Sequence, residues 1–231
     1  MIYFLGNFFN SGMSGSVIFA IVVAYIIAIV LAFGMHEFSH AFSAYKLGDP
    51  TAKALGRLTL NPIKHLDLYG MLGFLFVGFG WAKPVPINPL NFRRYRRDTF
   101  IVSVSGVLTN LILAFVFSGA YFFFYVNCAK FVGGVLTYSN ALLYFVHYFF
   151  QFMVIINLGL FIFNLLPIFP LDGFNAVKAC CKRRNKFIDF MHSYGNLILL
   201  FIIITPIFDV VYRAVTGYFT EIFFNFWGLF A

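Results

Sequence analysis

Long apolar segments alternate with polar, basic segments along the chain. The first apolar segment begins near Val17, and the helix that it predicts covers about residues 17–47. Three more apolar segments cover about residues 98–126, 140–173 and 195–216. Each is long enough to cross the hydrocarbon core of a bilayer, which takes about 20 helical residues. The pattern predicts an all-α polytopic membrane protein with about four to six transmembrane helices, forming a single domain over residues 1–231.

Residues 49–97, between the first and second spans, have a different composition. They contain Pro50, Pro62, Pro84, Pro86 and Pro89, most of the 8 prolines of the chain. Their apolar core, residues 68–81, is also interrupted by several glycines. This core is too short and too rich in glycine to predict a crossing helix. We expect a membrane-associated β-hairpin or re-entrant loop here, followed by a cytoplasmic loop.

The composition supports a membrane protein and excludes two other classes. Hydrophobic residues make up 61% of the chain and charged residues 10%, whereas about 25% of a soluble domain is charged. A soluble globular domain and a disordered chain are therefore both excluded. The three cysteines are an odd number and include the adjacent pair Cys180 and Cys181, so they indicate no disulfide framework.

Basic residues lie mainly in two segments. Of the 16 Lys and Arg residues, fourteen lie either between the first and second spans or between the third and fourth. The positive-inside rule therefore places both segments in the cytoplasm and both termini outside. The net charge of +8 then reflects membrane topology and not nucleic-acid binding. Residues 1–16 lack the basic start and cleavage site of a signal peptide, so we expect the first apolar segment to be retained.

An HExxH motif closes the first span. His36 and His40 are one helical turn apart and therefore share one face of the helix, where two imidazoles can bind one Zn²⁺. Glu37 lies beside them and can accept a proton from a metal-bound water. The alternative is a solvated polar patch, but ionisable groups near a bilayer are costly and usually have partners and functions.

Asp172 is the candidate for a third ligand. It is the only acidic residue between Asp98 and Asp189, and it follows two prolines at the end of the third span. A backbone break there lets a side chain turn inward, and the topology places Asp172 at the same cytoplasmic depth as the two histidines. The spacing alone leaves an equal alternative, an aspartate that caps a helix or a turn before Gly173.

These motifs together resemble the site-2 proteases, the intramembrane zinc metalloproteases of peptidase family M50, in their small prokaryotic branch. The likeness covers about residues 30–175, including an N-x-x-P-x-x-P-L-D-G sequence at residues 164–173. Further similar segments are residues 48–52, 56–62, 65–67 and 80–86. One departure is Val107, which stands where the family pattern has proline. From the length of the sequence we expect no PDZ or CBS domain of the kind that some relatives carry.

The resemblance implies a role for each matching residue. His36, His40 and Asp172 would bind one Zn²⁺ per chain, and Glu37 would be the catalytic general base. Asn164 would help to bind the substrate or the oxyanion. An interhelical hydrogen bond is the alternative for this asparagine.

The resemblance also extends to the loop between the first two spans. Gly78 and Gly80 match a G-x-G element that would offer a strand edge to an unwound substrate, and loop flexibility is the alternative. His65 and Asp67 match family positions that could orient the site from outside the ligand set.

The implied function is hydrolysis of a peptide bond within or near a transmembrane segment of a membrane protein. Water activated by Glu37 and zinc would attack a locally unwound substrate. The implied partners are a transmembrane protein or peptide substrate and the lipid bilayer, without nucleic acid, and an oligomer is compatible with the sequence. The location would be a bacterial or archaeal cytoplasmic membrane, with the active site near the cytoplasmic side. Two alternatives stay open, a membrane metal transporter and a non-catalytic membrane scaffold.

Overall fold

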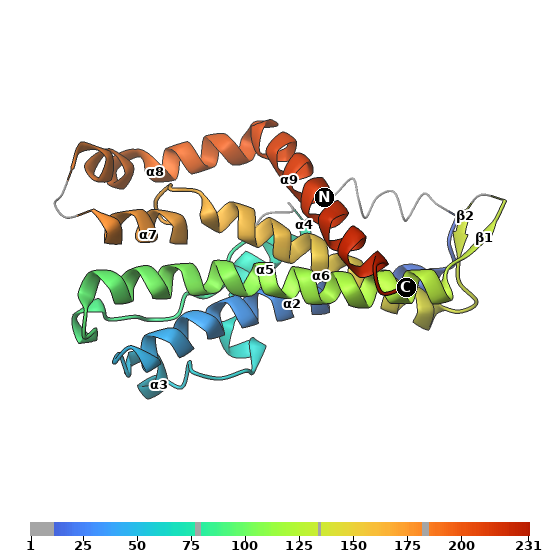
Figure 1. Cartoon of the computed structure of the whole chain (residues 1–231), viewed down its shortest axis with the longest axis horizontal. Coiled ribbons are helices and arrows are strands. Elements are labelled where there is room, and N and C mark those ends of the chain that lie inside the picture. Colours follow the sequence, from blue (N-terminus) through green and yellow to red (C-terminus); the bar gives the residue numbers. More distant parts are fainter. Residues whose placement is uncertain (1–11, 77–79, 134, 182–184) are drawn as a thin grey trace.

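The computed structural model describes residues 12–76, 80–133, 135–181 and 185–231, and these are mostly helical. Four helices are long and apolar enough to cross a membrane: α2 (Gly15–Lys46), α5 (Tyr95–Cys128), α6 (Ala141–Leu165) and α8 (Lys186–Ile204). The expected fold class, an all-α protein with about four to six spans, is confirmed. Figure 1 shows α2, α5 and α6 running side by side along the molecule.

Small residues on one face of α2 allow it to pack closely in the bundle. Ala24, Ala28 and Ala32 follow one another at intervals of one turn and are fully buried. They share a core with Phe152 and Met153 of α6. Small side chains let two membrane helices approach closely, and this compensates for the weak hydrophobic drive between helices in lipid. The packed face of α2 continues toward its C-terminal end, where the HExxH motif lies.

The last helix, α9 (Ile207–Gly228), crosses against α5 far from the HExxH motif (Figure 1). The ring of Trp227 lies over Gly119, where a Cβ would come within 2.7 Å of it. The indole N–H of Trp227 donates a hydrogen bond of 3.0 Å to Ser118 Oγ. Helix α8 ends before α9 at Thr205 and Pro206, where the proline interrupts the apolar segment.

The segment between α2 and α5 is built from short helices. These are α3 (Thr51–Ala54), η1 (Pro62–His65), α4 (Leu68–Phe76) and η2 (Pro89–Asn91), and the described residues between 49 and 97 include no strand. The glycine-rich apolar core therefore forms a helix as far as Phe76 instead of the first strand of a β-hairpin. The antiparallel strand pair of the structure, β1 (Lys130–Val132) and β2 (Val135–Thr137), instead joins α5 to α6.

Asp49 fixes this segment to the end of α2. Its fully buried carboxylate accepts hydrogen bonds from the Asn88 amide N–H at 2.7 Å and from Asn91 Nδ2 at 2.7 Å. It also accepts from the backbone and hydroxyl of Thr51. Burial alone would raise the pKa of Asp49, but these hydrogen bonds outweigh it and hold the pKa below its ordinary value. The carboxylate therefore stays ionised and keeps the loop in place.

Helix α7 (Asp172–Cys180) begins close to the end of α6 and packs mainly against α5. Pro167 and Pro170 cannot continue α6, which ends at Leu165. Gly173 then passes so close to α6 that a Cβ there would lie 2.4 Å from the Leu165 carbonyl oxygen. Only glycine permits this approach, so the turn places Asp172 at the start of α7 and against the bundle.

Candidate metal centre

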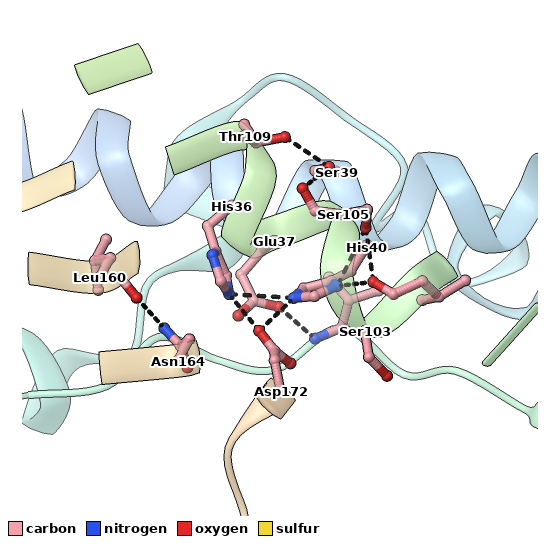
Figure 2. A network of polar contacts seen from close by, with 12 residues as sticks. His36, Glu37, Ser39, His40, Ser103, Ser105, Thr109, Leu160, Asn164 and Asp172 are labelled. Carbon is pink, nitrogen blue, oxygen red and sulfur yellow. Dashed lines mark hydrogen bonds and ion pairs between the residues drawn. The ribbon is translucent and has the colours of Figure 1, made fainter. Parts of the chain in front are cut away.

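The structure brings His36, His40 and Asp172 together, although they come from α2 and α7 (Figure 2). The two imidazole Nε2 atoms are 3.1 Å apart. Asp172 Oδ2 lies 3.1 Å from His36 Nε2 and 3.1 Å from His40 Nε2. Both histidines are buried, so these three atoms form a compact group inside the bundle.

Each histidine is held from behind by a hydrogen bond at its Nδ1. His40 Nδ1 lies 2.8 Å from the Val102 carbonyl oxygen, and His36 Nδ1 lies 2.5 Å from Asn110 Oδ1. A carbonyl oxygen only accepts hydrogen bonds, so Nδ1 must carry the proton. In the neutral rings, Nε2 therefore presents a lone pair toward Asp172.

The donor set fits a zinc ion. Two imidazole nitrogens and one carboxylate oxygen converge, and none of the three supplies a proton to the others when the rings are neutral. Their mutual distances of 3.1 Å approach the edge of about 3.3 Å expected in a tetrahedral zinc site with bonds of 2.0–2.1 Å. Three protein ligands leave the fourth position for water or substrate, which is typical of a catalytic zinc site.

Gly106 of α5 provides the space that the two rings occupy. A Cβ at this position would lie 2.5 Å from His40 Nε2 and 2.7 Å from His36 Cε1. On the same helix, Ser105 accepts a hydrogen bond of 2.9 Å from the Ser39 hydroxyl through its carbonyl oxygen. Small residues thus bring α5 against α2 at the level of the histidines, and any side chain at residue 106 would enter the site.

The two histidines favour the charged form of Asp172. Burial alone would raise the pKa of this carboxyl group, but a protonated imidazole attracts the carboxylate and donates to it from Nε2, and this stabilisation, first by His40 and then by His36, outweighs burial. The pKa of Asp172 is therefore held well below its ordinary value. An ionised carboxylate is the form that binds a metal ion.

Glu37 points toward the group of ligand candidates in Figure 2. Its Oε2 accepts a hydrogen bond of 2.8 Å from the backbone N–H of Val85. Val85 belongs to the segment before η2 that forms neither helix nor strand, and both residues are buried. This contact fixes the carboxylate beside the histidines without drawing it into the Nε2 and Oδ2 triangle.

The other predicted residues have contacts of their own. Asn164 Nδ2 donates a hydrogen bond of 3.1 Å to the carbonyl oxygen of Leu160, one turn earlier in α6 (Figure 2). Gly80 lies in the same irregular segment as Val85, outside helices and strands. Gly78 lies outside the described residues.

His65 and Asp67 make hydrogen bonds within the loop and not to the histidines of the site. His65 Nε2 lies 2.9 Å from the Thr59 carbonyl oxygen, and the His65 carbonyl accepts a bond of 2.9 Å from the Lys83 N–H. Asp67 Oδ1 accepts from the Gly70 N–H at 2.8 Å, at the start of α4. These contacts shape the chain that carries Val85.

Sequence reasoning did not assign roles to four residues around the site. Gly106 and Asn110 lie near Val107 in the sequence, and Asn157 and Arg57 lie in other segments. The signal in the sequence is an asparagine within an apolar span, because polar side chains in membrane helices usually have partners. In the structure both Asn110 and Asn157 are fully buried. Arg57 gave a weaker signal, since it is one of many basic residues in its loop.

The comparisons with known proteins agree with this site. The profile of peptidase family M50 matches residues 24–205. A protein of Bacillus subtilis named "Putative zinc metalloprotease YwhC" is 41% identical over 184 residues, which cover 79% of this chain and 80% of that protein. A protein of Mycolicibacterium smegmatis named "Putative zinc metalloprotease Rip2" is 28% identical over 190 residues, or 77% and 67% of the two chains.

No solved structure matches the chain, so the family assignment rests on sequence. The profile spans most of the chain, including all three members of the His-His-Asp group and Glu37. The chain belongs to peptidase family M50, a family of zinc metalloproteases.

Proposed function

We propose that this protein is an intramembrane zinc metalloprotease of the site-2 type, which cuts a membrane protein within or near a transmembrane segment. The observation that carries the proposal is the convergence of His36 Nε2, His40 Nε2 and Asp172 Oδ2 at 3.1 Å. This group lies where α2, α5 and α7 meet, in a chain with four helices that are long and apolar enough to cross a membrane. A hydrolytic centre in that position would act on substrates that are themselves in the membrane.

His36, His40 and Asp172 would hold one Zn²⁺ per chain. When bound, zinc supplies Lewis-acid chemistry, which activates water and polarises a carbonyl group. Glu37 would accept the proton of the attacking water, and we assign this step to Oε1 because Oε2 already accepts from Val85. The protonated Glu37 would then return the proton to the leaving amine.

The substrate must expose a peptide bond that a helix would conceal. A transmembrane helix satisfies its backbone internally, so the segment to be cut has to unwind locally. The segment from Gly80 to Val85 forms neither helix nor strand and reaches Glu37 at Val85, so it could pair with the unwound segment as an added strand. Asn164 would assist from α6 through its Oδ1 or its second amide hydrogen, since one hydrogen of Nδ2 already bonds the Leu160 carbonyl.

We place the site near the cytoplasmic side of the membrane. The C-terminal end of α2, the start of α5 and helix α7 lie at the same end of the bundle (Figure 1). The two segments that hold most of the basic residues emerge at this end. Basic loops stay on the cytoplasmic side of a membrane, and this places His36, His40 and Asp172 there.

The test uses the protein in liposomes together with a tagged single-span protein whose span contains helix-weakening glycine and proline residues. Glu37→Gln should bind as much zinc as the wild type, while cleavage falls by about 10²–10⁴-fold because the proton acceptor is lost. Glu221→Gln, which changes the other glutamate of the chain, is the matched control. Mass spectrometry of the products should locate the cut in or beside the span.

Two results would contradict the proposal. Cleavage at an unchanged rate by Glu37→Gln would remove the proposed base. Zinc transport into the liposomes by both wild type and Glu37→Gln, without cleavage, would favour a metal transporter. A scaffold would neither cut nor transport.

A further inference from the structure

We propose that Asn157, which does not touch any ligand candidate, acts through Asn110 to fix the tautomer of His36 that can bind the metal. Asn157 and Asn110 are positioning residues in this account. The proposal rests on the metal site proposed above, and it adds a buried relay between α6 and α2. The relay crosses α5, so three of the long helices contribute to the orientation of one imidazole ring.

The relay is a continuous line of short hydrogen bonds. Asn110 Oδ1 lies 2.5 Å from His36 Nδ1, and Asn110 Nδ2 lies 2.8 Å from Asn157 Oδ1. Asn157 Nδ2 in turn lies 2.7 Å from the carbonyl oxygen of Met153. Both asparagines are fully buried, and His36 is 5% exposed, so water cannot replace a missing partner.

The direction of every bond in this line follows from its last member. The Met153 carbonyl oxygen can only accept, so the Asn157 atom that faces it must be the NH₂ group. The oxygen of Asn157 then faces Asn110, whose own NH₂ group must donate to it. Asn110 therefore presents its oxygen to His36 Nδ1. The Met153 carbonyl, which can only accept, thus fixes the orientation of both amide groups.

The consequence for His36 is a single neutral tautomer. Facing an oxygen acceptor, Nδ1 must carry the proton, and Nε2 keeps its lone pair. Nε2 is the atom that lies 3.1 Å from Asp172 Oδ2 in the candidate metal group. A reversed Asn110 amide would present hydrogens to Nδ1, which favours the tautomer with a proton on Nε2 and blocks metal binding there. Asn157 prevents that reversal because it accepts from Asn110 Nδ2.

His40 needs no such relay. Its Nδ1 lies 2.8 Å from the backbone carbonyl of Val102, an acceptor whose polarity cannot reverse. The two histidines of the site are therefore oriented by different hydrogen-bond partners. His40 is held by the backbone of α5, whereas His36 is held by two side chains that a substitution can remove.

The first test compares Asn157→Leu with Asn157→Asp in the detergent-purified protein. Leucine has a similar volume but neither donates nor accepts, so the Asn110 amide becomes free to reverse. A neutral aspartic acid can donate to the Met153 carbonyl and accept from Asn110, and the relay is kept. We expect Asn157→Leu to bind zinc about 10–100-fold more weakly than the wild type, and Asn157→Asp to bind it as the wild type does.

A purely structural role for Asn157 predicts the opposite order. An apolar leucine would then suit the membrane interior better than an ionisable aspartate. Ser118→Ala is the matched control, since Ser118 is also fully buried on α5 and bonded to another helix through Trp227. It should lower thermal stability and leave zinc affinity unchanged. Wild-type affinity in Asn157→Leu, or equal losses in Asn157→Leu and Asn157→Asp, would overturn the proposal.

A second measurement does not depend on whether a variant of Asn110 or Asn157 folds. Nitrogen NMR of ¹⁵N-histidine-labelled, zinc-free wild type in lipid bilayers reports which ring nitrogen carries the proton, and His36→Gln identifies the His36 signals. We expect the proton on Nδ1, and a His36 ring with its proton on Nε2 alone would overturn the proposal. A wild type that binds no zinc would contradict the proposed metal site, while this NMR result would still decide the relay.

Discussion

The backbone N–H of Val85 donates a hydrogen bond of 2.8 Å to Oε2 of Glu37. The loop between α2 and α5 thus reaches the proposed base directly, across 48 positions of sequence. Arg57 fixes the chain just before Val85, because its Nη2 donates to the Lys83 carbonyl at 2.6 Å. Glu37 is therefore positioned by a loop that is itself held by a buried guanidinium group.

Replacing Arg57 should reduce turnover without removing the metal ligands. In Arg57→Ala the chain at Lys83 and Pro84 loses its clamp, and Val85 no longer holds the Glu37 carboxylate in one position. We expect zinc content to stay at the wild-type level while kcat falls by about 10–100-fold, a typical effect of losing an orienting contact. Parallel measurements of zinc and of peptide cleavage would check this.

Arg213→Ala provides the comparison for Arg57→Ala. Arg213 is an exposed arginine that pairs with Asp209, far along the chain from the site, and its loss should change neither quantity. Equal kcat in Arg57→Ala and Arg213→Ala would show that the clamp does not position Glu37.

Adding one methyl group at Gly106 should close the metal site. The new Cβ would lie 2.5 Å from His40 Nε2, within the distance at which something must shift. We expect Gly106→Ala to lose most of its zinc, although alanine favours a helix by about 1 kcal/mol over glycine. Gly217→Ala in α9, where a Cβ meets nothing within 4 Å, should gain stability and keep its zinc. Full zinc occupancy in Gly106→Ala would contradict the packing that we describe.

The parts of the site that could be predicted are those that local spacing determines. His36 and His40 share a helical face because they are four residues apart, and the two prolines before Asp172 indicate a turn at the end of a span. The topology then places all three at one depth. The structure brings their ligand atoms within 3.1 Å of one another.

The parts that could not be predicted depend on the register between helices. Asn110 and Asn157 are 47 positions apart, and nothing in either segment reveals that their side chains meet. Gly106 matters only because α5 lies against α2 at the histidines. The conformation of residues 49–97 could not be predicted either, because a segment with several prolines and glycines can adopt many backbone conformations. The hydrogen bonds of Asp49 with Asn88 and Asn91 stabilise one of them.

The pH dependence of metal binding should arise from the histidines, because the Asp172 carboxylate does not titrate near neutral pH. The pKa of Asp172 is lowered in the folded protein. This group therefore stays ionised at pH values well below the ordinary pKa of an aspartate and loses its charge only in strong acid. Zinc affinity should fall between pH 7.5 and pH 5.5 because protons compete for the imidazole nitrogens. It should fall less steeply in Asp172→Asn, where no carboxylate 3.1 Å from the two Nε2 atoms stabilises a protonated imidazole. Chelator competition at the two pH values measures both affinities, and an equal or steeper fall in Asp172→Asn would contradict this prediction.

Zinc removal should abolish cleavage reversibly. A chelator that strips the metal leaves the two imidazoles and the Asp172 carboxylate in place, and the bundle does not depend on the ion for its apolar core. We expect activity to vanish in the zinc-free protein and to return when about one zinc per chain is added back. Activity that persists after complete removal would exclude metal-dependent hydrolysis at this site.

The most direct test of the account is the zinc content of purified wild type beside Asp172→Ala. His36 and His40 belong to one helix, so only Asp172 tests whether the two distant parts of the chain form one metal site. Asp209→Ala removes an exposed carboxylate from α9 and serves as the control. The account predicts about one zinc per chain in wild type and Asp209→Ala, and a clear loss in Asp172→Ala. Full zinc content in Asp172→Ala, or none in wild type, would contradict it.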